Sequence, residues 1–237
     1  MGFNLRNRVL AAIAVASPAV FAAAASAASH TWHVTEVFSN ASGTIQFIEL
    51  QEVGGLAGET FLSGHGVRSA ATGNLFTFPA NISGSTANEH LLLATAGFAA
   101  LPGAPTPNYT IPSGFFSTAG DTIQYGVAPP GSLYDSFTFG AGTLPTNGKD
   151  SIQVTNFVTH AFTTGANTPQ NFAGQSGHVD ACPMDCDGTN TGVVSIADFL
   201  AVLAQWGMSG TSCDKDGGAG VAIGEFLAVL ATWGACS

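Results

Sequence analysis

Acidic residues near the C-terminus recur with the spacing of a calcium-binding loop. Between residues 214 and 225, which we call loop 2, Asp214 and Asp216 stand at positions 1 and 3 of twelve, and Glu225 stands at position 12. Calcium loops use carboxylates at these positions and a backbone carbonyl at position 7. Gly220 supplies that carbonyl, whereas Gly218 at position 5 offers no side-chain ligand. The spacing predicts a calcium site with a weakened ligand set.

A related segment, loop 1, covers residues 185–198 and is fourteen residues long. Aligned from both ends, it places acidic residues at positions 1, 3 and 12 and leaves Thr189 and Asn190 as an insertion. Oxygen ligands in this order again favour Ca²⁺, so one or two calcium ions are the expected cofactor. The expected ligands, with the fourth acting through its carbonyl, are Asp185, Asp187, Thr191, Val193, Ser195 and Asp198.

Each loop is followed by one copy of a repeated apolar segment. Residues 196–207 recur 27 positions later as residues 223–234, with nine of twelve positions identical. Apolar residues fall at the spacing of one helical stripe, and each copy ends at a glycine, which commonly stops a helix. We expect two helices that pack against each other through these stripes. The stripe residues are Ile196, Phe199, Leu200, Leu203 and Trp206, with Ile223, Phe226, Leu227, Leu230 and Trp233.

The same residues allow an interpretation without calcium. Acidic side chains in the first turn of a helix stabilise its N-terminus, so the loops can instead serve as caps on a helix pair held by disulfides. The four cysteines, Cys182, Cys186, Cys213 and Cys236, all lie in this part of the chain. An even number in an exported chain predicts disulfides, and a second closely spaced Cys or His pair for zinc is missing. Three pairings remain open, one of which joins the ends of the segment.

The order loop, helix, loop, helix resembles the duplicated repeat of type I dockerins. The resemblance covers about residues 182–236 and includes Asp-x-Asp-Gly at 185–188, Val194 and Val221, and the acidic residue before each Phe-Leu pair. It implies a small all-α, EF-hand-like helix pair over 182–237. It also implies calcium-dependent folding and docking onto a cohesin-like partner protein.

Residues 28–172 have the pattern of an antiparallel β protein. Short runs of β-branched and aromatic residues alternate with turns rich in Gly, Pro, Asn and Ser, which favours a sandwich or barrel. The turn at 39–43 lies between two such runs and predicts a hairpin. The expected strands are 32–38, 44–51, 74–78, 90–95, 121–125, 136–139 and 151–157.

This part of the chain resembles the lamin-tail domain of bacterial secreted proteins. The resemblance rests on the ordered motifs at 34–38, 46–50, 62–64, 76–79, 91–95 and 120–123, with an ending at 164–169. It implies an immunoglobulin-like antiparallel β-sandwich, so the whole chain is expected to be mainly β. It implies little about chemistry, because a fold does not fix a function. Residues 173–181, which are mostly small and polar, are expected to form a linker.

The first 27 residues have the pattern of a secretory signal peptide. Arg6 and Arg8 precede an apolar run, and Ala25-Ser26-Ala27 matches a cleavage site. A membrane anchor is the alternative, but the run is weakly hydrophobic, and no later segment is apolar enough to span a membrane. Cleavage near Ala27 leaves 3 basic and 15 acidic residues, a formal charge of 3 − 15 = −12. We expect a secreted or cell-surface protein that does not bind nucleic acid.

Residues 28–172 contain no nucleophile elbow, phosphate loop or metalloprotease helix. Glu36 and Glu49 can be considered as a glycosidase pair, although we interpret them as carboxylates at an edge or on the solvent face. The sequence therefore favours a non-catalytic adaptor or surface protein that binds a protein or a polysaccharide. The main alternative is an extracellular hydrolase, for example of polysaccharide, that carries a docking module. A third interpretation is that the module only targets or anchors the chain during export.

Overall fold

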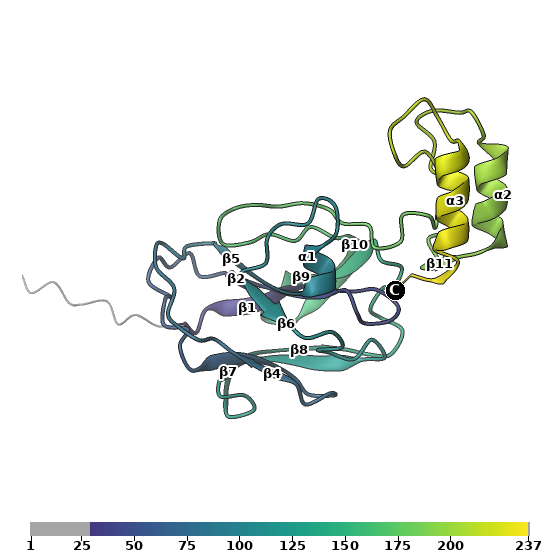
Figure 1. Cartoon of the computed structure of the whole chain (residues 1–237). Coiled ribbons are helices and arrows are strands. Elements are labelled where there is room, and N and C mark those ends of the chain that lie inside the picture. The colour runs from purple at the N-terminus through teal and green to yellow at the C-terminus, as the bar shows by residue number, and fades with distance from the viewer. Residues whose placement is uncertain (1–28, 237) are drawn as a thin grey trace, which may run out of the picture.

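The computed structural model describes residues 29–236, which form a β part and a small helical part at the C-terminus (Figure 1). The expected signal peptide at 1–27 and its cleavage site near Ala27 lie outside these residues. In the range that the structure describes, no helix has both the length and the hydropathy needed to cross a membrane. The C-terminal module, defined here as residues 182–236, lies at one end of the β part.

Two sheets form the β part. The larger sheet has the strand order β10-β9-β1-β2-β5-β6, and the smaller has the order β4-β3-β7-β8. All of their strand pairs are antiparallel except β5 with β6. The bounds are β1 Trp32–Ser39, β2 Gln46–Glu52, β3 His65–Ser69, β4 Leu75–Thr77, β5 His90–Thr95, β6 Tyr109–Ile111, β7 Asp121–Val127, β8 Ser132–Phe139, β9 Asp150–Asn156 and β10 Ala161–Ala166, with a short helix α1 at Ala96–Ala99.

The two sheets pack face to face around one apolar core. Val34 and Ile48 enter it from the larger sheet, and Val67, Ile123 and Phe137 enter it from the smaller sheet. The side chains of a strand alternate between its two faces, so these apolar residues supply the inner face of each sheet. The predictions of a mainly β chain with antiparallel sheets, and of seven of its strands, are confirmed. Strands β3, β6 and β10 are additional to those that the sequence predicted.

The predicted hairpin at 39–43 joins β1 to β2, which pair from Ser39 and Gln46 onward. Asn40 organises the turn, because its side-chain oxygen accepts the Ile45 N–H at 3.1 Å. Gly43 has a positive φ of 71°, a conformation that glycine adopts without a steric penalty. The turn residues thus have the backbone conformations that their types favour.

The segment after β10 is packed against the sandwich. The buried Asn167 side chain donates to the carbonyls of Lys149 and Val179 at 2.6 and 2.7 Å. Val179 belongs to a second apolar cluster, with Phe38 and Phe47 on the outer face of the larger sheet. Residues 173–181, which were expected to be a linker, therefore include side chains and backbone groups that are bound to the β part.

The module contains two antiparallel helices, α2 (Ile196–Ala204) and α3 (Ile223–Ala231). Strand β11 (Val193–Val194), before α2, pairs with β12 (Gly234–Ala235), after α3. Gly207 and Met208, after α2, likewise bond to Val221, before α3. These two pairs of contacts are related by the 27-residue repeat, so the module has approximate twofold symmetry.

The prediction that the apolar stripes pack against each other is wrong for most of their residues. The helices meet through the buried Val202 and Val229 and the partly buried Phe199 and Phe226, whose ring centroids are 5.3 Å apart. The module core also includes the four cysteines of both disulfides. The other stripe residues are exposed, and they are Ile196, Leu200, Leu203, Trp206, Ile223, Leu227, Leu230 and Trp233.

All four cysteines form disulfides, as predicted. Cys182 bonds to Cys236 and joins the two ends of the module. Cys186 bonds to Cys213, which lies 27 positions later and therefore at the same place in the repeat. Disulfides persist in oxidising compartments, so both bonds are compatible with an extracellular location.

Candidate metal centre

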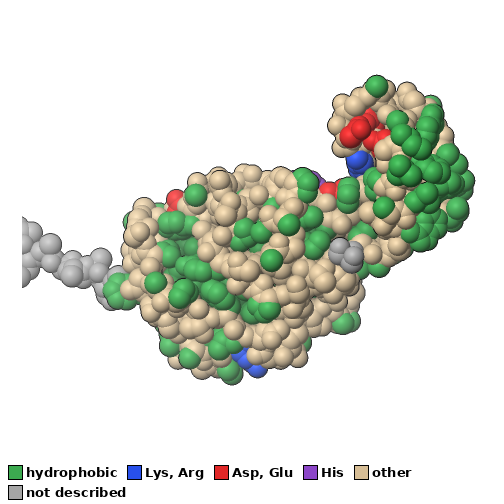
Figure 2. Space-filling view, viewed as in Figure 1, with side chains coloured by type: hydrophobic (Ala, Val, Ile, Leu, Met, Phe, Trp, Pro, Cys, Tyr) green, Lys and Arg blue, Asp and Glu red, His purple; other side chains and the backbone are tan. Residues whose placement is uncertain are grey.

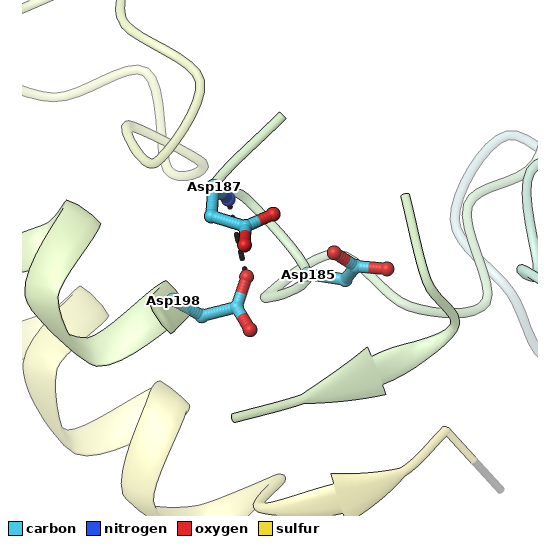
Figure 3. A group of neighbouring side chains, drawn as sticks. All are labelled: Asp185, Asp187 and Asp198. Carbon is cyan, nitrogen blue, oxygen red and sulfur yellow. Dashed lines mark hydrogen bonds between the residues drawn. The ribbon is translucent and has the colours of Figure 1, made fainter. Parts of the chain in front are cut away.

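Loop 1 brings three carboxylates together in front of α2. Asp185 and Asp187 come from the loop, and Asp198 comes from the first turn of the helix. One oxygen of each lies within 4.8 Å of the others, and the three side chains are drawn side by side in Figure 3. This geometry can hold a metal ion that prefers oxygen ligands.

Asp185 gives the strongest sign that this site fits a cation. The residue is 1% exposed, and its Oδ2 accepts the Gly192 N–H at 2.6 Å. Its Oδ1 is buried and, among the described residues, has no hydrogen-bond partner. Burial raises the pKa of Asp185, although the Gly192 hydrogen bond and the Lys149 charge oppose the shift. A buried carboxylate oxygen without a partner costs free energy, and a bound cation removes that cost.

Asp198 is held as an anion by hydrogen bonds. Its Oδ1 accepts the N–H groups of Cys186 and Asp187 at 2.7 and 3.1 Å. Its Oδ2 accepts the Ser195 N–H at 2.8 Å, which forms a capping box with the Ser195 hydroxyl. Burial acts to raise the pKa of Asp198, but the hydrogen bonds from Ser195, Asp187 and Cys186 outweigh it and lower the pKa. The capping role and a metal-binding role are therefore compatible.

The remaining predicted ligands of loop 1 lie between these acids. The Thr191 hydroxyl donates to the Val193 carbonyl at 3.1 Å, so the ligands expected at positions 5 and 7 are neighbours. The Ser195 hydroxyl lies 3.2 Å from Asp198 Oδ2. Gly192, at position 6, makes the bond to Asp185 and has a positive φ of 74°, in agreement with the glycine that calcium loops use at their sharp turn.

Loop 2 gathers Asp214, Asp216 and Glu225, and one oxygen of each again lies within 4.8 Å of the others. Asp214 Oδ2 accepts the Gly210 N–H at 2.7 Å, and its buried Oδ1 has no hydrogen-bond partner in the described range. The buried Glu225 accepts the Ala222 N–H at 2.9 Å. This loop can also hold a cation, with fewer enclosing groups than loop 1.

Positions 5 and 7 of loop 2 are glycines, which offer only backbone groups. The Gly218 N–H donates to Asp216 Oδ1 at 2.7 Å, so position 5 contributes a bond to the backbone in place of a side-chain ligand. Gly220 has a φ of 118°, and a Cβ there would lie 2.8 Å from the Met208 carbonyl carbon. The residue that supplies the expected position 7 carbonyl must therefore be glycine.

Lys149 also belongs to the surroundings of loop 1, and the sequence did not single it out. Its ammonium group donates to the Asp185 carbonyl at 2.6 Å and to Asn190 Oδ1 at 2.9 Å. Lys149 lies 36 positions before Asp185, so no local spacing could have indicated the contact. The only signal was the scarcity of basic residues in the chain.

The interpretation of Glu36 and Glu49 as carboxylates at an edge or on the solvent face is wrong. Both are buried and stand opposite each other on β1 and β2. Glu36 accepts hydrogen bonds from Ser151 and Thr168. Glu49 accepts hydrogen bonds from the Gln170 N–H and Thr35 and lies 2.8 Å from a His90 ring nitrogen. Because all four oxygens are engaged, the pair gives no support to a glycosidase site.

Comparisons of this chain with models of protein families, with curated proteins and with solved structures find no match.

Proposed function

We propose that this protein is an exported, non-catalytic adaptor whose C-terminal module docks onto another extracellular protein in a calcium-dependent manner. In this proposal residues 28–172 form an immunoglobulin-like, lamin-tail-like sandwich, and residues 182–237 form a dockerin-like module that binds one or two Ca²⁺ ions. The partner corresponds to the cohesin-like protein that the sequence resemblance implies. The proposal rests mainly on one observation, the exposed apolar face of the helix pair.

The apolar face consists of four residues from each helix segment, and each residue is 45–60% exposed. Figure 2 shows hydrophobic side chains gathered over the module on the side that faces away from the sandwich, with acidic side chains on the other side. A contiguous exposed patch larger than a few hundred Å² is rare on monomeric proteins and marks an interaction site. The face contains Ile196, Leu200, Leu203, Trp206, Ile223, Leu227, Leu230 and Trp233.

The chemistry of the face favours a protein partner. The only charged residues of α2 and α3 are Asp198 and Glu225, both buried at the loops, so the face itself carries no charge. The neighbours of Trp206 and Trp233 on it are aliphatic, whereas recognition of a sugar also requires polar groups that fix its hydroxyls. On the order of 800 Å² per partner is enough for a stable protein interface, and eight large side chains supply an area of that order.

Calcium supports docking by ordering the loops that begin both helices. Asp198 and Glu225 are at once the last residues of the loops and members of the first helical turns. A cation bound by both parts of a loop therefore fixes the start of the helix that follows. The two helices then hold the two halves of the apolar face in a single arrangement.

The first test is calorimetry of the oxidised, exported chain with CaCl₂. We expect heat from the wild type and none from a variant that combines Asp187→Ala with Asp216→Ala. Mass spectrometry then identifies a protein captured with the chain, and that protein is purified for direct binding measurements. The purified partner should bind the wild type in calcium, and binding should be lost in EDTA and in Leu200→Ser/Leu227→Ser.

Val158→Ser is the matched control, because Val158 is 91% exposed and lies on the sandwich, outside the module. It should bind the partner as the wild type does. Wild-type affinity in Leu200→Ser/Leu227→Ser would contradict the proposal. Self-association alone, or binding of a polysaccharide without a protein partner, would contradict it as well.

A further inference from the structure

A turn of the sandwich, residues 146–149, contacts the module, and we call it the junction turn. The Gly148 carbonyl accepts the Ala181 N–H at 2.8 Å, just before the module begins. The Asn147 side chain accepts the N–H groups of Lys149 and Asp150 at 3.0 and 2.9 Å. The turn is therefore internally braced, and its position is set by the sandwich.

Lys149 extends from this turn to loop 1. Its ammonium group donates to the Asp185 carbonyl and to Asn190 Oδ1. Asp185 is the acidic residue that has a buried oxygen without a partner. A side chain of the sandwich thus fixes the backbone of the residue at position 1 of loop 1.

The two inserted residues of loop 1 take part in the same contact. The Thr189 N–H and hydroxyl donate to Asp187 Oδ1 at 2.8 and 2.6 Å. Asn190 adopts a left-handed conformation with φ 50° and presents its side chain to Lys149. The insertion therefore links the candidate ligand Asp187 to the sandwich through consecutive residues.

Gly192 brings the two backbones together at the other side of loop 1. A Cβ at this position would lie 2.8 Å from the Thr146 carbonyl oxygen and 2.9 Å from the Asn147 Cα. The Gly192 N–H binds Asp185 Oδ2, and the Gly192 carbonyl accepts the Cys236 N–H at 3.0 Å. The Cys236 carbonyl in turn accepts a hydrogen bond from the Asn40 side chain of the sandwich at 3.2 Å.

Loop 2 has no such connection. It has the regular length of twelve residues and lacks the insertion. Within the described part of the chain, its hydrogen bonds all go to residues of the module. The two loops therefore have similar acids but different surroundings.

We propose that loop 1 is a calcium-dependent joint between the module and the sandwich, with Lys149 as its positioning residue. This inference rests on the calcium binding put forward under the proposed function. Binding of the cation orders Asp185 and Asp187, and these residues and the insertion then hold the junction turn. By linkage, a cation that stabilises this contact is itself bound more tightly because of it. Calcium at loop 1 thus orients the apolar face relative to the sandwich, and calcium at loop 2 does not.

Hydrogen exchange with mass spectrometry on the full oxidised chain tests the joint. In the wild type, calcium should slow exchange in peptides that cover the junction turn by about fivefold or more. Asp187→Asn should abolish this protection, and the matched change Asp216→Asn in loop 2 should leave it intact. Lys149→Met should lose the protection while calorimetry still reports calcium binding.

Three further variants separate the effect of the position of Lys149 from the effect of its charge. Lys215→Met removes the same charge from the cleft that both lysines border, and it should keep the protection. Lys149→Arg, which retains a charged donor, should restore it, and Asn190→Ala should reduce it with no change of charge. Calcium binding without protection of the junction turn in the wild type would overturn this inference alone. Absence of calcium binding would overturn the proposed function and this inference with it.

Discussion

Glu36 and Glu49 show how a segment distant in sequence determines the state of a side chain. They face each other across β1 and β2, beneath Thr168 and Gln170 of the segment after β10. Burial raises the pKa of Glu36 to about 7, and the neighbouring Glu49 carboxylate adds to the shift, whereas the hydrogen bonds from Ser151 and Thr168 oppose it. Glu36 therefore changes its charge near neutral pH.

Replacement of Glu36 by Gln should stabilise the sandwich in alkaline solution. The folded pKa of about 7 lies above the ordinary value of 4.5, so the contribution of Glu36 to stability is full below about pH 4.5 and falls as the pH rises through 7. The free energy of unfolding of Glu36→Gln minus that of the wild type should rise by about 3 kcal/mol between pH 4 and pH 8. Urea unfolding at both pH values measures it. An unchanged difference would show that Glu36 does not titrate in this range.

Residue spacing predicted which acids come together, but it did not predict the surroundings of other acids. Asp185, Asp187 and Asp198 are close in sequence, so a loop pattern was enough to group them. Glu36 is buried by contacts with residues more than 100 positions away, which no local pattern contains. The contact between Lys149 and loop 1 could not be predicted for the same reason.

At the scale of elements, the 27-residue repeat predicted both helices. It did not predict which face of each helix packs against the other. A helical period identifies an apolar stripe, and each stripe here is wide enough to offer more than one packing surface. Phe199 and Val202 face the partner helix, whereas Leu200 and Leu203 face outward. The Cys186–Cys213 disulfide and the loops fix this choice, and their arrangement depends on the fold of the whole module.

The Cys186–Cys213 disulfide should make the helix pair partly independent of calcium. It closes a separation of 27 residues, for which chain entropy predicts about 3.5 kcal/mol of stabilisation. In EDTA, Cys186→Ser/Cys213→Ser should lose the far-ultraviolet circular dichroism of α2 and α3, and calcium should restore it. The wild type should keep part of this helical signal in EDTA and all of it in calcium. A variant that melts in EDTA at the wild-type temperature would contradict this role of the bond.

For the whole molecule, composition, turn-forming residues and the repeat predicted a β part followed by two helices, and the strands and helices lie in these parts of the chain. The sequence did not indicate that residues 173–181 pack against the sandwich, because small polar residues are typical both of packed surface segments and of free linkers. In the structure Asn167 and Val179 hold this segment to the sandwich, and the junction turn contacts loop 1. The orientation of the module is therefore set by contacts on both sides of Cys182.

The chain offers few sites to proteases that cut after basic residues. In the described range Arg68 bonds to Gln124 within the sheet, Lys149 is bound to loop 1, and Lys215 is exposed in loop 2. Limited trypsin digestion should therefore release residues 216–237 only after reduction, and Lys215→Met should resist it. Loss of this fragment on a non-reducing gel would contradict the expectation.

The Cys182–Cys236 bond spans the exposed position at Lys215. A chain that is cut there thus remains one covalent molecule while the bond is oxidised. It retains the segment that carries α3 and half of the apolar face, so a single cut leaves both halves of that face on one molecule.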